Sequence, residues 1–141
     1  MTKGKKKYLP LTSENVFIAY KVLQDKNLVS FGIPFDANQK IESAISTVNA
    51  DYFDYVLYPT SKLQAAACLF YVTKAHAFTD GNKRVAVLAV ATFCKINDLE
   101  LKLPKESLAA LSLYIEQTKI IDSEPFIHAL CKVMFTDTST S

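Results

Sequence analysis

The sequence predicts an all-α protein, a compact helical bundle in which one polar loop separates two central helices. Apolar residues recur at helical spacing over most of the chain, and cap-forming residues stand at the breaks. Segments 60–75 and 82–96 are apolar on most faces, which favours a central position for both. Because 141 residues suit one core, we predict a single helical domain over residues 9–135. A basic flexible tail (1–8) and a flexible C-terminal tail (136–141) are expected to flank it.

The N-terminal half is expected to form two helices joined by a loop. The first begins at the cap-type residues Thr12-Ser13-Glu14 and ends near Lys26. Residues 30–35 contain a glycine and a proline, which favour an extended loop. Asp36 is then expected to cap a second helix. Segment 49–59 is rich in tyrosine and aspartate and is expected to be irregular. The apolar face of the second helix consists of Ile41, Ala44, Ile45 and Val48.

The C-terminal half is expected to add two helices after the central pair. The pair Asn97-Asp98 can end the second central helix, because both residues tolerate left-handed backbone angles. Residues 99–103 alternate in polarity like a short extended piece. A helix is predicted over 104–118, where a proline suits the first turn. The last helix is predicted from residue 123 or 125 to about 135.

Composition argues against several classes of protein. Half of the residues are hydrophobic and 21% are charged, as in soluble globular domains. The longest uncharged stretches, around 63–73 and 85–94, reach about half of the roughly 20 apolar residues that a bilayer span needs. No apolar run of a signal peptide follows the first lysines. We therefore expect no membrane helix and a cytoplasmic protein. The cysteines are odd in number and widely spaced, which predicts buried thiols at Cys68, Cys94 and Cys131.

The net charge of +2 does not predict a nucleic-acid interface. Four lysines lie in the first seven residues, so the overall charge of +2 leaves −2 for the remainder of the chain. A short basic tail on a near-neutral body lacks the clustered basic face that binding to a phosphate backbone needs. We expect no direct binding of nucleic acid.

The candidate chemistry is concentrated in one loop, HAFTDGNKR, at residues 76–84. Gly81 and Asn82 stand at the turn that opens the second central helix, where the first N–H groups have no partners within the helix. Lys83 and Arg84 add two cations in the first turn, where acidic residues are usual. Arg84 is the single arginine in the chain, beside fifteen lysines. This combination favours a site for a polyphosphate.

The residues before that turn add a base, an anchor and a metal ligand. His76, at the end of the preceding helix, could accept a proton from a hydroxyl near physiological pH. Phe78 is expected to turn inward and anchor the loop, so that the polar residues face outward together. Asp80 offers the carboxylate oxygen that Mg²⁺ prefers. Each residue alone could be an ordinary turn, cap or core residue, but two cations beside a histidine and a carboxylate favour a catalytic site.

The loop resembles the signature of Fic/Doc proteins, His-x-Phe-x-Asp/Glu-Gly-Asn-Lys/Gly-Arg, and fills every fixed position. The resemblance extends over about residues 36–101, although Asn97-Asp98 stands where Asn-Gly is more common. The chain is most similar to the death-on-curing (Doc) branch. Fic proteins that transfer AMP usually carry glycine and a second arginine where this chain has Lys83 and Val87. In the Doc branch the lysine obstructs the usual phosphate pose, and the nucleotide is thought to bind inverted, presenting its γ-phosphate.

The resemblance implies an all-α Fic-type fold and transfer of a phosphate from ATP to a Ser/Thr hydroxyl of a protein, which for Doc kinases is elongation factor Tu. His76 would deprotonate the acceptor, and Asp80 would hold Mg²⁺. The phosphates would be cradled by Gly81, Asn82, Lys83 and Arg84. A cognate Phd-like antitoxin, whose disordered tail folds along a groove, is the implied partner. Self-inhibition is not expected, because Pro10 stands at the first position of the only Ser/Thr-x-x-x-Glu-Gly/Asn candidate.

Three alternatives stay open at this point. The same site could transfer AMP instead of phosphate, or the domain could be an inactive Fic-fold module that binds a partner. A zinc hydrolase is disfavoured, because His76 and His128 lie 52 residues apart without a metal-ligand spacing nearby. His128 is expected to serve packing or surface. Target specificity is expected to lie in the loops before Tyr58.

Overall fold

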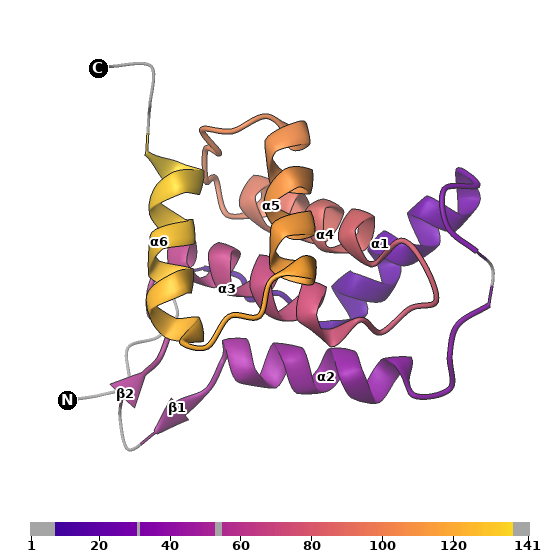
Figure 1. Ribbon diagram of the computed structural model, residues 1–141, viewed down its shortest axis with the longest axis horizontal. Helices are drawn as coiled ribbons and strands as arrows, with labels where there is room; N and C mark the ends of the chain where they lie inside the picture. Colours follow the sequence, from indigo (N-terminus) through magenta and orange to yellow (C-terminus); the bar gives the residue numbers. More distant parts are fainter. Residues whose placement is uncertain (1–7, 31, 53–54, 137–141) are drawn as a thin grey trace.

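The computed structural model contains six helices and one two-stranded β-hairpin in the part of the chain that it describes, residues 8–30, 32–52 and 55–136 (Figure 1). The helices are α1 (Ser13–Asp25), α2 (Ala37–Val48), α3 (Ser61–Ala75), α4 (Asn82–Ile96), α5 (Lys105–Gln117) and α6 (Ser123–Phe135). The strands are β1 (Asp51–Tyr52) and β2 (Tyr55–Val56), paired antiparallel. The predicted all-α class is confirmed.

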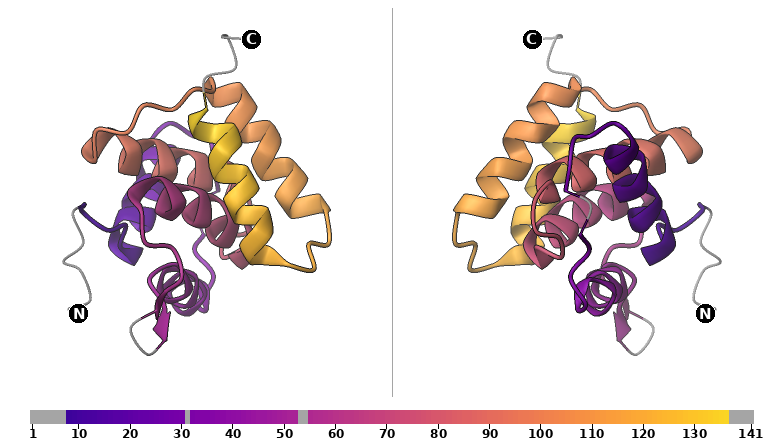
Figure 2. Two further views of the ribbon diagram at one scale, coloured as in Figure 1. Left: turned by 90° about the vertical axis from the view of Figure 1, so that its left-hand side faces the viewer. Right: turned by 90° about the vertical axis from the view of Figure 1, so that its right-hand side faces the viewer.

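Helices α3 and α4 form the centre of the bundle, as predicted. Helix α3 packs against α2, α4, α5 and α6, while α4 packs against α1, α3 and α5. Figure 2 shows α1 on one side of this central pair and α5 with α6 on the other. Burial extends around α3, which explains why its sequence shows no single apolar face. Its buried residues are Gln64, Ala65, Ala66, Ala67, Cys68, Leu69, Phe70, Val72 and Thr73.

The two predicted caps in the N-terminal half have different outcomes. Thr12 caps α1 as expected, because its hydroxyl accepts from the Asn15 N–H at 3.2 Å and its own N–H donates to Asn15 Oδ1 at 3.1 Å. Asp36 occupies the N-cap position of α2, as predicted, but it forms no side-chain cap. Its backbone has φ −95° and ψ 4°, not the extended conformation of a capping residue, and its side chain makes no capping hydrogen bond. The carboxylate pairs instead with Lys40 at 3.4 Å.

The segment predicted to be irregular, 49–59, contains the hairpin. Asp51 pairs with Val56 and Tyr52 with Tyr55, which corrects the expectation at these positions. The aromatic and β-branched residues of this segment favour strands, so a two-residue pairing forms although the segment is short. Gln64 fixes the segment that leads into α3. Its buried Nε2 donates to the carbonyls of Val48 (3.0 Å) and Tyr58 (2.7 Å).

The C-terminal boundaries follow the prediction closely. Helix α4 ends at Ile96, and Asp98 adopts the expected left-handed conformation with φ 56°. Segment 99–103 forms no strand, so its alternating pattern does not reflect a sheet. It is attached to the last helix by the Lys102 N–H, which donates to the Met134 carbonyl at 2.8 Å. Pro104 immediately precedes α5, one position before the first turn where it was expected.

The cysteines and the chain ends complete the fold. Cys68 and Cys94 are buried free thiols, as predicted, whereas Cys131 is only partly buried. Burial raises the pKa of the Cys94 thiol to about 12, so it is protonated at neutral pH. Tyr8 packs edge-on against Phe93 with ring centroids 6.1 Å apart. The remainder of the predicted basic tail, 1–7, and residues 137–141 lie outside the described residues. Among the residues that the structure describes, no helix is both long enough and apolar enough to cross a membrane.

Candidate active site

The polar loop connects the C-terminus of α3 to the N-terminus of α4, so both central helices end at the candidate site (Figure 1). His76 ends α3 in a left-handed conformation with φ 45° and ψ 51°. Gly81 precedes α4 with φ 77°. A left-handed histidine is uncommon and strained, and such residues persist where the surrounding structure holds them. The sharp turn at His76 leaves its side chain exposed at the end of a buried helix.

Phe78 anchors the loop on the core, which confirms its predicted inward orientation. Its ring is 2% exposed. It stacks on Tyr20 with centroids 4.2 Å apart and an interplanar angle of 10°, and it meets Phe17 edge-on at 5.6 Å. Both partners belong to α1, so the loop packs against the first helix through Phe78.

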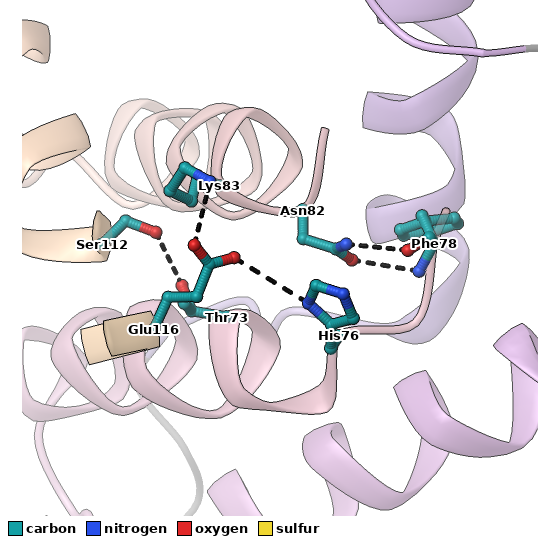
Figure 3. Close-up of polar contacts among 7 residues, drawn as sticks. All are labelled: Thr73, His76, Phe78, Asn82, Lys83, Ser112 and Glu116. Atoms are coloured by element: carbon teal, nitrogen blue, oxygen red, sulfur yellow. Dashed lines mark hydrogen bonds and ion pairs between the residues drawn. The ribbon is translucent and has the colours of Figure 1, made fainter. Parts of the chain in front are cut away.

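The Asn82 side chain stabilises the loop through two hydrogen bonds to the Phe78 backbone. Its Nδ2 donates to the Phe78 carbonyl at 2.8 Å, and its Oδ1 accepts from the Phe78 N–H at 3.0 Å (Figure 3). The side chain is buried, unlike the exposed His76, Asp80 and Arg84. The expected outward orientation therefore holds for those three residues and is wrong for Asn82. The Asn82 amide thus fixes the shape of the loop, while its backbone N–H belongs to the first turn of α4.

Gly81 occupies a position that only glycine fits. A Cβ atom there would lie 2.1 Å from Val29 Cγ1, far inside van der Waals contact. The positive φ of 77° is also unfavourable for a residue with a side chain. Gly81 supplies no side-chain cap to α4. The first-turn N–H groups therefore remain an electropositive helix end suited to an anion.

Asp80 is an exposed carboxylate whose orientation is set by the loop between α1 and α2. Ser30 donates to its Oδ1 twice, from the backbone N–H at 2.9 Å and from the hydroxyl at 2.7 Å. These two hydrogen bonds, with a smaller contribution from the charge of Arg84, lower the pKa of Asp80, so the group is ionised at neutral pH. Both bonds reach one oxygen, which leaves Oδ2 as the better placed metal ligand.

The residues present fit Mg²⁺ only together with a phosphate. Among the residues described, no three His, Cys, Asp or Glu side chains are grouped so as to hold a metal ion. Mg²⁺ commonly binds through one or two carboxylates while keeping waters and sharing phosphate oxygens. Asp80 is therefore suited to a nucleotide-bound Mg²⁺, and the absence of a His and Cys cluster in this part of the chain gives no support to a zinc site.

The two cations differ in their surroundings. Arg84 Nη1 donates to the Leu28 carbonyl at 2.7 Å, which attaches the segment after α1 to the start of α4. A guanidinium has five N–H donors, so most of its capacity remains for a phosphate. Lys83 Nζ lies 3.0 Å from Glu116 Oε1 on α5.

Glu116 was not identified from the sequence. Its Oε2 lies 3.8 Å from His76 Nδ1, so one carboxylate stands between the candidate base and Lys83 (Figure 3). No local motif surrounds Glu116, and it reaches the site only because α5 packs against both α3 and α4. Sequence reasoning could have found it only by predicting how these helices pack.

The loops before Tyr58, predicted to set target specificity, lie at two different places. The loop between α1 and α2 is at the site, since Leu28, Val29 and Ser30 contact Arg84, Gly81 and Asp80. The hairpin precedes the other end of α3, whose 15 residues span about 22 Å. His128 is exposed on α6, in agreement with the expected surface role.

Fold and loop together define a class of helical domain, in which a His-x-Phe-x-Asp-Gly-Asn-Lys-Arg loop joins two buried helices. Residues 12–94 match the Fic/DOC family, and the chain belongs to that family. Enzymes of this family generally use ATP and transfer nucleotide or phosphate groups to protein hydroxyls. No curated protein and no solved structure matches the chain. The match ends within α4, so Glu116 and the rest of α5 lie outside it.

Proposed function

We propose that this protein is a Doc-like kinase, which transfers the γ-phosphate of ATP to a Ser/Thr hydroxyl of a protein. Lys83 carries the proposal. It stands where AMP-transferring relatives usually have glycine, and its ammonium lies at the start of α4 on the side that faces Glu116 and His76 (Figure 3). Val87 supports the same assignment, because a half-buried apolar residue occupies the position of the second arginine. A lysine in place of glycine favours the inverted nucleotide that presents its γ-phosphate.

In the proposed reaction, the candidate residues of the loop have separate roles. His76 accepts the hydroxyl proton as the acceptor oxygen bonds to the γ-phosphorus, and the bond from that phosphorus to the β–γ bridging oxygen breaks to release ADP. Arg84 and the first N–H groups of α4 bind the phosphates. Asp80 would hold Mg²⁺, which would neutralise developing charge on the phosphates. Because phosphoryl transfer depends mainly on positioning and charge stabilisation, no covalent nucleophile is needed.

ATP labelled on either the α- or the γ-phosphate tests this assignment. The purified chain is incubated with Mg²⁺, a bacterial lysate and, in a parallel reaction, purified elongation factor Tu. We expect label from the γ-phosphate alone to enter protein, and chelation of Mg²⁺ to abolish it. Entry of α-label would overturn the kinase assignment in favour of AMP transfer. No protein labelling from either nucleotide would favour a module that only binds a partner.

The toxin role and a Phd-like antitoxin complete the proposed function. A groove of about 750 Å³ lies between α1, α4 and α5, and reaches the candidate site at Lys83 and Arg84. Apolar side chains such as Val22, Leu88 and Leu113 line it, and Lys26 and Lys105 add positive charge. These features suit an amphipathic segment with acidic residues, which would also cover the cations of the site.

Substitution of Leu113 with glutamate should leave toxicity intact while preventing inhibition by the antitoxin. Because Leu113 lines the groove and is not a residue of the loop, the variant is expected to arrest growth like the wild type, but co-expression of a Phd-like antitoxin should no longer relieve the arrest. Ile121→Glu is the matched control, since Ile121 is 87% exposed and is not among the residues that line the groove. Full relief of Leu113→Glu toxicity would show that the antitoxin binds elsewhere.

A further inference from the structure

We propose that Glu116 is a positioning residue for His76, and that its carboxylate keeps the proton of the neutral imidazole on Nδ1. The other nitrogen, Nε2, is then the atom that accepts the proton of the protein hydroxyl. This inference deepens the proposed function and rests on it, since it takes His76 as the base.

The charges around His76 support this role. Glu116 Oε1 lies 3.0 Å from Lys83 Nζ, while Oε2 lies 3.8 Å from His76 Nδ1 (Figure 3). The Glu116 side chain is 25% exposed and that of Lys83 is 41% exposed, so water screens the pair less than on an open surface. Lys83 holds one carboxylate oxygen and the geometry directs the other to the imidazole. An ammonium has three N–H donors, so Lys83 can keep this pair and still meet a phosphate.

A buried contact one turn earlier sets the position of Glu116. Ser112 and Thr73 share a hydrogen bond of 2.8 Å, and both side chains are buried. Residues four apart on a helix lie on one face, which places Glu116 next to Ser112 on α5. His76 lies directly after the end of α3, where its N–H donates to the Thr73 carbonyl at 3.3 Å. The two helices are thus held in a register that brings the carboxylate to the ring. Beyond Glu116, Lys74 Nζ donates to the Thr118 carbonyl at 2.9 Å and holds the end of α5 on α3.

The chemistry of imidazole explains why such a residue is useful. A neutral histidine carries one proton, and the nitrogen that lacks it is the base, so the partner of one nitrogen decides which nitrogen reacts. A carboxylate beside Nδ1 favours the proton there and faces the positive ring that forms when Nε2 takes a second proton. The distance of 3.8 Å exceeds a hydrogen bond. Such contacts often tighten when substrate binds.

Replacement of Glu116 with glutamine tests the inference in two ways. In the purified chain, nitrogen chemical shifts of the His76 ring at alkaline pH report the tautomer without any substrate. We expect the Nδ1–H form to predominate in the wild type, and a mixture of tautomers in Glu116→Gln. In the labelling assay, kcat should fall about 10-fold or more, as for other groups that orient a functional histidine, with KM for ATP unchanged. Glu116→Asp should recover part of kcat.

Glu100→Gln is the control, because it makes the same chemical change away from the site. The Glu100 side chain is 81% exposed and pairs with Lys102. Thermal unfolding of all variants separates a positioning effect from loss of the fold. An unchanged tautomer in Glu116→Gln would overturn the inference. So would a higher kcat with a lower KM for ATP, which would identify Glu116 as an anion that competes with phosphate. If the wild type transfers no phosphate, the proposed function fails, while the ring shifts still decide the role of Glu116.

Discussion

Replacing His76 with alanine is expected to lower the rate of phosphate transfer by about 10²- to 10⁴-fold, the usual contribution of a general base. The loop should keep its shape, because Phe78 and Asn82 hold it through contacts that do not involve the imidazole. Binding of ATP should therefore change little. Initial rates of γ-label transfer, with nucleotide affinity measured separately by calorimetry, check this expectation.

His128→Ala is the matched control for this variant. These are the two histidines of the chain, and His128 is exposed on α6, outside the loop. We expect the control to keep the wild-type rate and the wild-type effect on growth. Full growth toxicity in His76→Ala would show that chemistry at this histidine is not what the protein does, and would favour the inactive binding module.

The substitution Phe78→Ala should cause the largest loss of stability, about 3–5 kcal/mol, as is usual when a buried phenylalanine is truncated. The ring is 2% exposed and stacked on Tyr20 at 4.2 Å, so its removal leaves a cavity between α1 and the loop. Activity should fall as well, because the loop that carries His76 and Asp80 loses its anchor. Urea denaturation followed by circular dichroism gives the change in the free energy of unfolding.

Phe35→Ala makes the same chemical change at a fully exposed ring. Its effect on the free energy of unfolding should stay within about 0.5 kcal/mol, as for most surface substitutions. If Phe78→Ala proved no more destabilising than Phe35→Ala, the stacked ring would not be the anchor of the loop. The Asn82 hydrogen bonds would then be the main constraint on its shape.

The helices could be predicted closely because their signals are local. The capping box at Thr12 and the apolar faces of α1 and α2 depend on residues within a few positions of one another. Two of the errors concern choices between competing local structures. Asp36 has the composition of a cap but the backbone of a turn, and segment 49–59 has turn-forming residues beside strand-forming ones. The structure resolves both through local contacts, the pair of Asp36 with Lys40 and the pairing of β1 with β2.

The candidate site could be predicted only where its residues are contiguous. Histidine, carboxylate and cations fall within nine consecutive residues, so their types and spacing are visible in the sequence. Their partners are not. Ser30 reaches Asp80 from 50 residues away, and Glu116 reaches Lys83 from 33 residues away. Such pairs arise from the packing of α5 and of the loop between α1 and α2, for which the chain carries no local signal.

The amino-acid order alone was enough to establish the helical class, the central pair of helices and the chemical groups of the loop, because periodicity, capping and composition act over short distances. Folding in three dimensions added the orientation of each group. It turned the Asn82 amide inward, bonded Asp80 to Ser30 and placed Glu116 between His76 and Lys83. The physical reason is that a side chain's partners depend on helix packing and register, which arise from many weak contacts across the whole core.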